Sequence, residues 1–402
     1  MTDPETILRV AAKGDGVTQD GRHVPGTAPA DTVAADGTVT PGPHHAQPPC
    51  RHFPKCGGCQ LQHLDEESWA DFVSQRVVNA AEGQGLDPAR AAPPHLSPPR
   101  SRRRATLHGE AKGKSVRIGF REGRSHRIVD MQECHVLRPE LFAMVEPLRR
   151  LVAAMGRRKW RGDIELALTD QGVDCTISGL DPDGLREIEA LGEFASGNRL
   201  ARLTLADEYG PQTHYEPDPV TVTFAGVPVD FPAGAFLQAT ADGEAALSAA
   251  ATSWLSGSTQ VADLFAGLGT FSFALAAEGA RVTAIEGARD TALACRRAAG
   301  RAQVPMTVEH RDLYRNPVTA AELATFDAVL LDPPRAGARE QVAQIAQSTV
   351  SRVCYVSCNP ASWAKDAAAL IAAGYRLEDL RPVGQFRWST HVELASLFVR
   401  TG

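Results

Sequence analysis

The chain has 402 residues, of which 43% are hydrophobic and 22% are charged, and its formal net charge is -6. This composition is typical of a globular protein with enough apolar material for two or three cores, which excludes a single small binding module. No long apolar stretch is free of charges or glycine, and the N-terminus lacks a basic segment followed by an apolar one. We therefore expect a cytoplasmic protein without a membrane span or a secretory signal.

The first two predicted units occupy the N-terminal 240 residues. Residues 1–47 contain short strand-like segments separated by GDG, VPG and PGP, which are typical turn sequences and predict a small β module. Residues 48–240 contain a helical stretch at 66–82 and alternating runs such as DIELALT and VDCTIS. This mixture predicts an α+β middle domain.

Three of the eight cysteines follow one another closely, as Cys50, Cys56 and Cys59 in CRHFPKCGGC. Disulfides are not expected in a chain without a secretory signal, and thiols at this spacing are typical of metal ligands. A metal centre of this kind needs a fourth ligand, for which Cys134 in DMQECHVL is the nearest candidate along the chain. The spacing leaves both a zinc site and an iron–sulfur cluster open.

Basic residues are concentrated in two segments although the whole chain is acidic. Ten lysines and arginines lie from Arg100 to Arg127, opposed only by Glu110 and Glu122, and six more lie from Arg149 to Arg161. Such clusters are typical either of a solvated charged face or of a surface that contacts RNA phosphates. Under the second interpretation, the run of three arginines at 102–104 is the first candidate for phosphate contact.

From residue 241 to residue 402 the pattern changes to regular alternation. Strand-like apolar runs such as ARVTAIEG, FDAVLLDPP and SRVCYVSC alternate with alanine-rich helical stretches. This alternation predicts a doubly wound α/β domain of Rossmann-like type, which binds its ligands at the carboxyl ends of its strands.

The first strand and helix of this predicted domain carry a glycine loop. In VADLFAGLGTFSF the loop contains Gly267 and Gly269, but Ser272 stands where a dinucleotide fingerprint has its third glycine. A smaller adenosyl ligand is therefore favoured over a dinucleotide. Glu286 ends the next strand, where it can accept from ribose hydroxyls, and Asp312 follows a third strand near the expected adenine. Together these residues favour S-adenosylmethionine.

Three later motifs carry candidate catalytic groups. Asp332 begins the stiff loop DPPR after one strand, and Cys358 in SCNP follows the next strand, where Asn-Pro forces a turn that presents the thiol. Glu393 in HVE precedes an apolar run at the C-terminal end of the chain. We predict that Cys358 is a nucleophile, since a thiolate activates a weakly nucleophilic carbon by adding to its neighbour.

These motifs, in this order, resemble those of the S-adenosylmethionine-dependent RNA 5-methyluridine methyltransferases. The matching segments are the CGGC cluster with a later cysteine, FLQAT, DLFAGLGTF, DPPRAG, SCNP and HVE. The iron–sulfur-containing ribosomal RNA enzymes are the most similar members, and the resemblance runs from about Cys50 to the C-terminus. It implies activity on RNA, with 23S rRNA favoured over tRNA. Nothing in the sequence indicates an obligate protein partner.

The resemblance also implies roles for particular residues. It implies that Glu393 removes the proton from carbon 5 of a uracil to which Cys358 has added at carbon 6. It implies a 4Fe–4S cluster and groups around the cofactor or the target base. The cluster ligands would be Cys50, Cys56, Cys59 and Cys134, and the surrounding groups Gln238, Phe265, Thr270, Glu286 and Asp332.

The sequence departs from the family pattern in places. The N-terminal TRAM domain, an oligonucleotide-binding-type barrel, is shortened to a partial module, and Ala266, Thr270 and Thr240 replace the usual Cys, Asn and Asn. Three other functions are open: a tRNA 5-methyluridine methyltransferase, a cytosine-5 methyltransferase, and a metal-cluster RNA-binding protein without catalysis.

Overall fold

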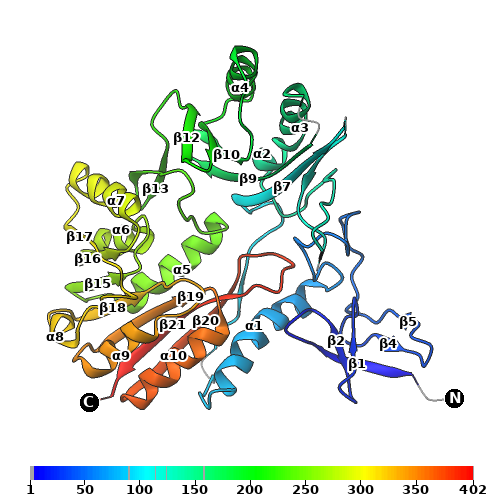
Figure 1. Cartoon of the computed structure of the whole chain (residues 1–402). Helices are drawn as coiled ribbons and strands as arrows, with labels where there is room; N and C mark the ends of the chain where they lie inside the picture. The colour runs from blue at the N-terminus through cyan, green and yellow to red at the C-terminus, as the bar shows by residue number, and fades with distance from the viewer. Residues whose placement is uncertain (1–3, 89–90, 114, 124, 157–158, 402) are drawn as a thin grey trace.

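The computed structural model describes residues 4–88, 91–113, 115–123, 125–156 and 159–401. The described chain forms three main β-sheets, of five, six and eight strands, and one short hairpin. Figure 1 shows the five-stranded sheet near the N-terminus, the six-stranded sheet in the middle region, and the eight-stranded sheet in the C-terminal region.

The N-terminal sheet is small and entirely antiparallel, with the strand order β3-β2-β1-β4-β5. Its strands are β1 (Glu5–Val10), β2 (Gly16–Thr18), β3 (His23–Val24), β4 (Thr32–Val33) and β5 (Val39–Thr40). The Asp31 side chain holds the turns together, because its carboxylate accepts from the backbone N–H groups of Ala28 and Gly42. The strand-like segments expected in residues 1–47 therefore pair with one another.

The C-terminal sheet has the strand order β17-β16-β15-β18-β19-β21-β20-β6. Neighbouring strands are parallel except at β21, which is antiparallel to β19 and β20. Its strands are β6 (His95–Leu96), β15 (Gln260–Leu264), β16 (Arg281–Glu286), β17 (Met306–His310), β18 (Ala328–Leu331), β19 (Arg352–Ser357), β20 (Tyr375–Gly384) and β21 (Glu393–Arg400).

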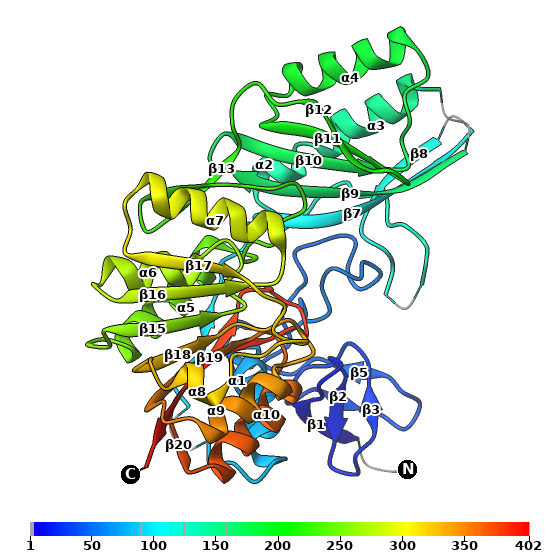
Figure 2. The same cartoon turned by 60° about the vertical axis from the view of Figure 1, so that its left-hand side comes forward.

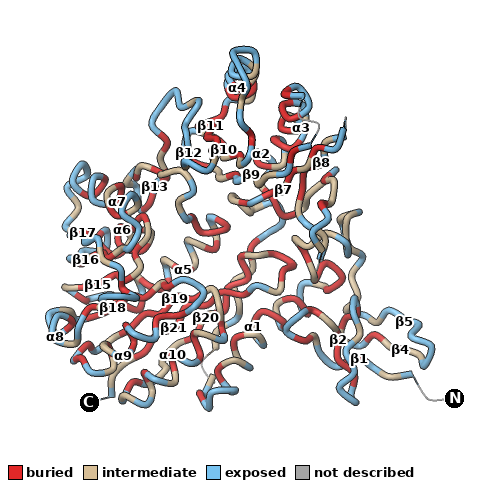
Figure 3. The backbone as a smooth tube through the Cα atoms, in the orientation of Figure 1, coloured by how far each residue is buried: buried red, intermediate tan, exposed pale blue. Residues whose placement is uncertain are grey.

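Helices cover both faces of this sheet, as expected for a doubly wound fold. One core packs α1, α9 and α10 against it, and another packs α5 and α6 against its opposite face. Figure 3 shows the buried strands β18, β19 and β21 between more exposed helices. The helices are α1 (Glu66–Glu82), α5 (Ala241–Trp254), α6 (Thr270–Ala277), α7 (Arg289–Arg301), α8 (Ala320–Leu323), α9 (Arg339–Gln347) and α10 (Pro360–Ala372).

The helix expected at 66–82 forms as α1, but it packs against the C-terminal sheet. Asp65 caps its first turn by accepting from the Ser68 backbone N–H at 2.8 Å. Its apolar side chains recur at helical spacing and pack with α10 and β20, while β6 joins the edge of the same sheet. The division at residues 47 and 240 stays a prediction, and these contacts cross it.

The middle sheet has the order β12-β11-β10-β9-β7-β8, with only β10 and β11 parallel. Figure 2 shows α3 and α4 on one side of it. Its elements are β7 (Arg104–Lys112), β8 (Ser115–Gly119), α2 (Pro139–Phe142), α3 (Val145–Ala154), β9 (Lys159–Thr169), β10 (Gly172–Ser178), α4 (Leu185–Gly197), β11 (Arg202–Asp207) and β12 (Gly210–Tyr215). The hairpin of β13 (Thr221–Phe224) and β14 (Val227–Asp230) leads from it towards α5.

Among the described helices, none is long and apolar enough to cross a membrane.

Candidate active site

The sequence-predicted residues of the C-terminal domain come together because their strands are parallel neighbours. Strands β17, β16, β15, β18 and β19 run side by side in that order, so their carboxyl ends share one edge of the sheet. The residues that end or follow them are Asp312, Glu286, Gly267, Asp332 and Cys358, in the same order. This is the edge at which open α/β sheets bind their ligands.

The glycine loop brings bare backbone to this edge. Gly267 and Gly269 have φ values of 56° and 91°, in the left-handed region that favours glycine. A Cβ on Gly269 would lie 2.8 Å from the sulfur of Cys295, so packing also requires glycine there. Phe265 adopts a φ of 64°, and Thr270 begins α6 directly after the loop. The loop is therefore held in a strained, specific conformation.

Two carboxylates adjoin this loop. Glu286 accepts from the backbone N–H of Gly267 at 2.8 Å and from that of Ala288 at 2.6 Å. Asp263, a residue that sequence reasoning missed, accepts from the Ser272 hydroxyl at 2.5 Å, and burial raises its pKa to about 7. Its second oxygen is buried without a partner among the described residues. A ligand with hydroxyl donors, such as an adenosyl group, fits this set of acceptors.

Asp312 lies in a turn, next to an aromatic pair. Its carboxylate accepts from the backbone N–H of Tyr314 at 3.0 Å and of Arg315 at 3.3 Å. The Tyr314 ring lies 5.5 Å from the ring of Phe265. Sequence reasoning missed Tyr314, which no motif marks. Its ring and that of Phe265, inclined to each other at 54°, provide an apolar wall beside the glycine loop.

Cys358 and Glu393 line one cleft of about 450 Å³, although 34 residues separate them in the sequence. Its walls come from the cysteine-rich loop, β7, the segment before α5, and the loop that joins β20 to β21. The remaining lining residues are Gly57, Gly58, Gln60, Arg102, Arg104, Ala105, Thr106, Phe120, Phe236, Arg335, Phe386, Ser389, Thr390 and His391. The cleft is large enough for a nucleobase and open enough for one to enter.

Glu393 is buried, and burial raises its pKa to about 7. A hydrogen bond from Gln385 and the charge of Arg104 oppose this effect. Gln385 is itself buried, and its amide also donates to Gln238 Oε1 at 2.8 Å and accepts from the Thr240 backbone N–H at 3.3 Å. Gln385 was missed because it belongs to none of the motifs. It orients both Gln238 and Glu393.

Cys358 is half-buried at the start of α10. Burial raises the pKa of its thiol, the charges of Glu393 and Asp332 raise it further, and Arg335 lowers it. Burial and the Glu393 charge also raise the pKa of Asp332 well above its usual value. Asn359 caps α10 and donates to the Arg335 carbonyl at 3.0 Å. The Cys358 thiol, the Glu393 carboxylate and the Arg335 guanidinium therefore line one cleft.

The arginines at 102–104 do not form a solvated basic face. Arg103 is paired with Glu244 at 2.5 Å, and Arg102 lies between the rings of Phe120 and Phe386, at 5.8 and 5.3 Å. Arg104 lies 4.5 Å from the ring of Phe236, which is 55% exposed and was also missed in the sequence. Of the two predicted basic segments, residues 114, 124, 157 and 158 lie outside the described residues.

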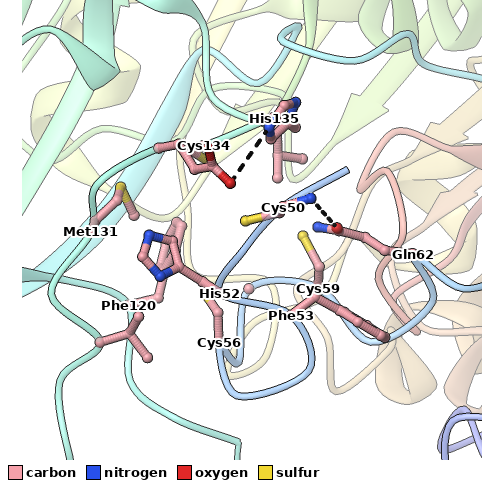
Figure 4. A pocket seen from close by; sticks show the side chains of 14 residues that line it. Cys50, His52, Phe53, Cys56, Cys59, Gln62, Phe120, Met131, Cys134 and His135 are labelled. Atoms are coloured by element: carbon pink, nitrogen blue, oxygen red, sulfur yellow. Dashed lines mark hydrogen bonds and ion pairs between the residues drawn. The ribbon is translucent and has the colours of Figure 1, made fainter. Parts of the chain in front are cut away.

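The four predicted metal ligands line a single pocket (Figure 4). Cys50, Cys56 and Cys59 come from one loop, and Cys134 comes from the segment between β8 and α2. Burial raises the pKa of the Cys56 thiol to about 11 and that of Cys59 to about 12. Phe120 contributes to the largely apolar walls. The pocket thus gathers the same four cysteines that the spacing singled out.

Glycines allow the cysteine-rich loop to approach its neighbours. A Cβ on Gly57 would lie 2.8 Å from the carbonyl oxygen of Arg121, and one on Gly58 would lie 3.0 Å from the Phe120 ring. The loop also contacts the cleft, since the backbone N–H groups of Gln60 and Leu61 donate to the Trp388 carbonyl at 2.8 and 2.9 Å. The cysteine pocket therefore supports the loop that precedes Glu393.

The sulfur spacing bears on which centre these cysteines fit. Four sulfurs around one tetrahedral zinc ion lie about 3.8 Å apart, given zinc–sulfur bonds of about 2.3 Å. Within the described ranges, only His44, Asp65 and Glu67 place three or more ligand atoms within 4.8 Å of one another. No three sulfurs of the described cysteines are that close. The four described sulfurs are therefore not arranged as the ligands of one tetrahedral zinc ion.

The architecture and the cleft together define an α/β methyltransferase domain joined to a cysteine-rich region. The structure is similar to that of a Pyrococcus abyssi tRNA (uracil-54, C5)-methyltransferase in complex with S-adenosyl-L-homocysteine. The TM-score is 0.75 at 20% identity, covering 99% of this chain and 100% of that one. At this identity the likeness concerns the fold, and it confirms the expected mixed α/β methyltransferase fold.

Sequence comparisons identify the family. The family profile described as tRNA (uracil-5-)-methyltransferase matches residues 230–401. An RNA methyltransferase of Zymomonas mobilis is 44% identical, over 98% of this chain and 99% of its own. A 23S rRNA (uracil(1939)-C(5))-methyltransferase of Pectobacterium atrosepticum is 34% identical, over 90% of this chain and 82% of its own. The chain belongs to the S-adenosylmethionine-dependent RNA (uracil-5-)-methyltransferases, as its motifs predicted.

Proposed function

We propose that this enzyme methylates carbon 5 of a uridine in 23S rRNA through a covalent adduct with Cys358. The observation that carries the proposal is the presence of Cys358 and Glu393 in one cleft. Cys358 also follows β19 on the sheet edge where the glycine loop follows β15. The rRNA relative from Pectobacterium supports this substrate, and its coverage of both chains is high. Such a substrate would place the enzyme in the cytoplasm.

The proposed chemistry begins at the thiol. The Cys358 thiolate adds to carbon 6 of the uracil, and the electron pair released towards carbon 5 makes that carbon nucleophilic. Bound S-adenosylmethionine supplies an electrophilic methyl group. Glu393 then removes the proton from carbon 5, and the carbon–sulfur bond breaks to restore the ring and the thiolate. A base with a pKa of about 7 suits this step, because it is substantially ionised at neutral pH and can hold the proton.

Groups in and beside the cleft would bind and orient the base. Reaching carbon 6 requires the uridine to leave its stack, and the exposed ring of Phe236 offers a replacement stacking surface. Asp332 has a raised pKa, so its carboxyl group can hold a proton and donate it to a uracil carbonyl. Gln238, oriented by Gln385, can contribute amide hydrogen bonds.

We propose further that S-adenosylmethionine binds along the sheet edge next to the glycine loop. Gly267 and Gly269 would bring backbone close to it, Phe265 and Thr270 would flank it, and Glu286 would accept from its ribose hydroxyls. Asp312 would lie near the adenine. Two observations support this placement: the Asp263 carboxylate has one oxygen without a hydrogen-bond partner among the described residues, and the space beside the Gly267 backbone is open.

The four cysteines would hold a 4Fe–4S cluster, with Cys50, Cys56, Cys59 and Cys134 as its ligands. Their common pocket, which gathers three thiols from one loop and a fourth from a distant segment, supports this assignment. The N-terminal five-stranded sheet would be a reduced TRAM-type module that helps to hold RNA. Lys13 of this module lines a second groove together with Gly57 and Thr390, which also line the cleft, and this continuity supports such a role.

The activity is tested with tritiated S-adenosylmethionine and separated RNA fractions from cells that lack the gene. We expect label in 23S rRNA, and nucleoside mass spectrometry should identify the product as 5-methyluridine. If the label is confined to tRNA, the substrate is tRNA and not 23S rRNA. If the product is 5-methylcytidine, the methylated base is cytosine and not uracil. An absence of label in every RNA would contradict the catalytic proposal.

A further inference from the structure

A third groove, separate from the one lined by Lys13, adjoins the cleft at Arg335 and lies on the C-terminal domain. It has a volume of about 740 Å³ and lies between the start of α9 and the first turns of α10. Three cationic side chains line it: Arg335, Arg339 and Lys365. Arg335 also lines the cleft, and Asn359, the residue after Cys358, lines the groove. The groove is therefore continuous with the candidate active site.

The three cations are exposed and available. Over the described ranges, no carboxylate forms an ion pair with Arg335, Arg339 or Lys365. Asp366 also lines the groove, but it is buried and accepts from the Ala338 backbone N–H at 2.8 Å and from the Tyr355 hydroxyl at 2.6 Å. The exposed acid beside Arg339 is its sequence neighbour Glu340. The groove thus has a net positive rim.

Two arginines of the sequence-predicted basic segments are, by contrast, already paired with carboxylates. Arg103 is paired with Glu244, and Arg149 is paired with Asp130 at 2.7 Å and with Glu146 at 3.0 Å. A paired arginine gives up an existing interaction when it contacts a phosphate, whereas an unpaired one gives up only water and mobile counterions. The groove is accordingly better suited to bind phosphate than these arginines.

The backbone around the groove adds to its positive potential. Helix α10 starts at Pro360 and α9 starts at Arg339, so the N-terminal ends of both helices border the groove. The partial positive charge of a helix N-terminus favours anions. A strand whose base enters the cleft must carry its backbone over the rim, where Arg335 stands between the two spaces.

We propose that this groove binds the phosphodiester backbone of the RNA strand on one side of the target nucleotide. Arg339 and Lys365 each contact a phosphate there, and Arg335 contacts the phosphate nearest the cleft. This assignment rests on the proposed function in one respect, namely that the substrate is an RNA strand with a base in the cleft.

The first test measures how RNA affinity depends on salt. Arg339→Ala combined with Lys365→Ala is compared with Arg289→Ala combined with Arg297→Ala, which removes two exposed α7 arginines outside the groove. The groove variant should flatten the slope of log affinity against log salt by about 0.7 per lost contact with single-stranded RNA. The α7 control should keep both the parent slope and the parent turnover. Equal slopes for both variants would overturn the proposal.

The second test places neutral methylphosphonate linkages one at a time on either side of the target uridine. The parent should lose affinity at the contacted linkages, and the groove variant should show no further loss there. Equal losses for parent and variant would overturn the groove. Loss of affinity at the neutral linkages in the parent alone, without methylation of any uridine, would support the phosphate-binding groove and contradict the proposed function. Methylation together with equal affinity losses in the parent and the groove variant would support the proposed function and contradict the phosphate-binding groove.

Discussion

Two kinds of cysteine site lie close together in this molecule, and their surroundings differ. Cys59 is 6% exposed and shares an apolar pocket with three other thiols. Cys358 is only half-buried, opens into the cleft and has the Arg335 guanidinium nearby. Burial raises the pKa of both thiols, but that of Cys59 rises to about 12.

The difference matches the two proposed roles, a metal ligand and a nucleophile. Thiols enclosed in an apolar pocket become thiolates when a cationic centre binds them, and that centre then links the segments from which they come. A nucleophile needs instead an open path to its substrate and a cation nearby. A hydrogen bond from the Gln60 backbone N–H to the Trp388 carbonyl joins the cysteine-rich loop to the loop before Glu393.

The largest expected effect separates Cys358 from a cysteine within the same sheet. Cys358→Ala should abolish methylation and leave the affinity for S-adenosylmethionine unchanged in calorimetry, because the thiol acts on the base. Cys354→Ala, which changes a buried side chain of β19, should retain methylation. Loss of cofactor binding in Cys358→Ala would contradict this division of roles.

The next prediction separates bond formation from release. Glu393→Gln keeps the shape of the side chain but cannot accept the carbon 5 proton, so turnover should fall by about 10²- to 10⁴-fold. The enzyme should accumulate as a methylated covalent RNA adduct, visible as a slow band on a denaturing gel. The band should vanish when Cys358→Ala is added. Parent turnover without an adduct would remove Glu393 from the role of base, and Asp332 would be examined next.

The third prediction concerns the cysteine pocket. Cys134→Ser should lose iron, acid-labile sulfide and the visible absorption of the anaerobically purified protein, since it removes one of four ligands. A decrease of about 2 kcal/mol in the free energy of unfolding would lower the Tm of a unit the size of the predicted middle domain by about 4 to 8 °C. The control Cys175→Ala changes a buried cysteine of β10 and should keep its iron. If the parent protein contains zinc and no acid-labile sulfide, the four cysteines hold zinc and the iron–sulfur assignment is wrong.

The smallest expected effect concerns pH. The rate should rise with pH through about 7, because Glu393 acts as a base only when ionised and its pKa is about 7. Gln385→Leu removes a hydrogen bond that lowers this pKa, so the acid limb of the pH–rate profile should move to higher pH. On that limb, turnover should fall about tenfold for each pH unit by which the pKa of Glu393 rises. Turnover should recover at high pH, and an equal loss at every pH would show that Gln385 has a purely structural role.

Much of the chemistry was visible in the sequence because short motifs carry it. The SCNP and HVE motifs singled out Cys358 and Glu393, and the family they indicated is confirmed by the comparisons. Alternating apolar runs predicted the C-terminal α/β domain, because buried parallel strands and amphipathic helices each require their own hydrophobic spacing. The roles of the individual site residues remain predictions.

Other features depended on contacts between residues far apart in the chain. Helix α1 has the same amphipathic pattern whichever core it joins, and only its packing with α10 assigns it to the C-terminal sheet. The arginines at 102–104 resemble a basic patch in sequence, but Glu244 and aromatic rings from distant segments engage them. Gln385 gains its role only through contact with Gln238 and Glu393. Local sequence patterns determined the helices, the strands and the reactive side chains. The tertiary structure decided which side chains contact one another and which are buried, and these contacts set their charge state and pKa.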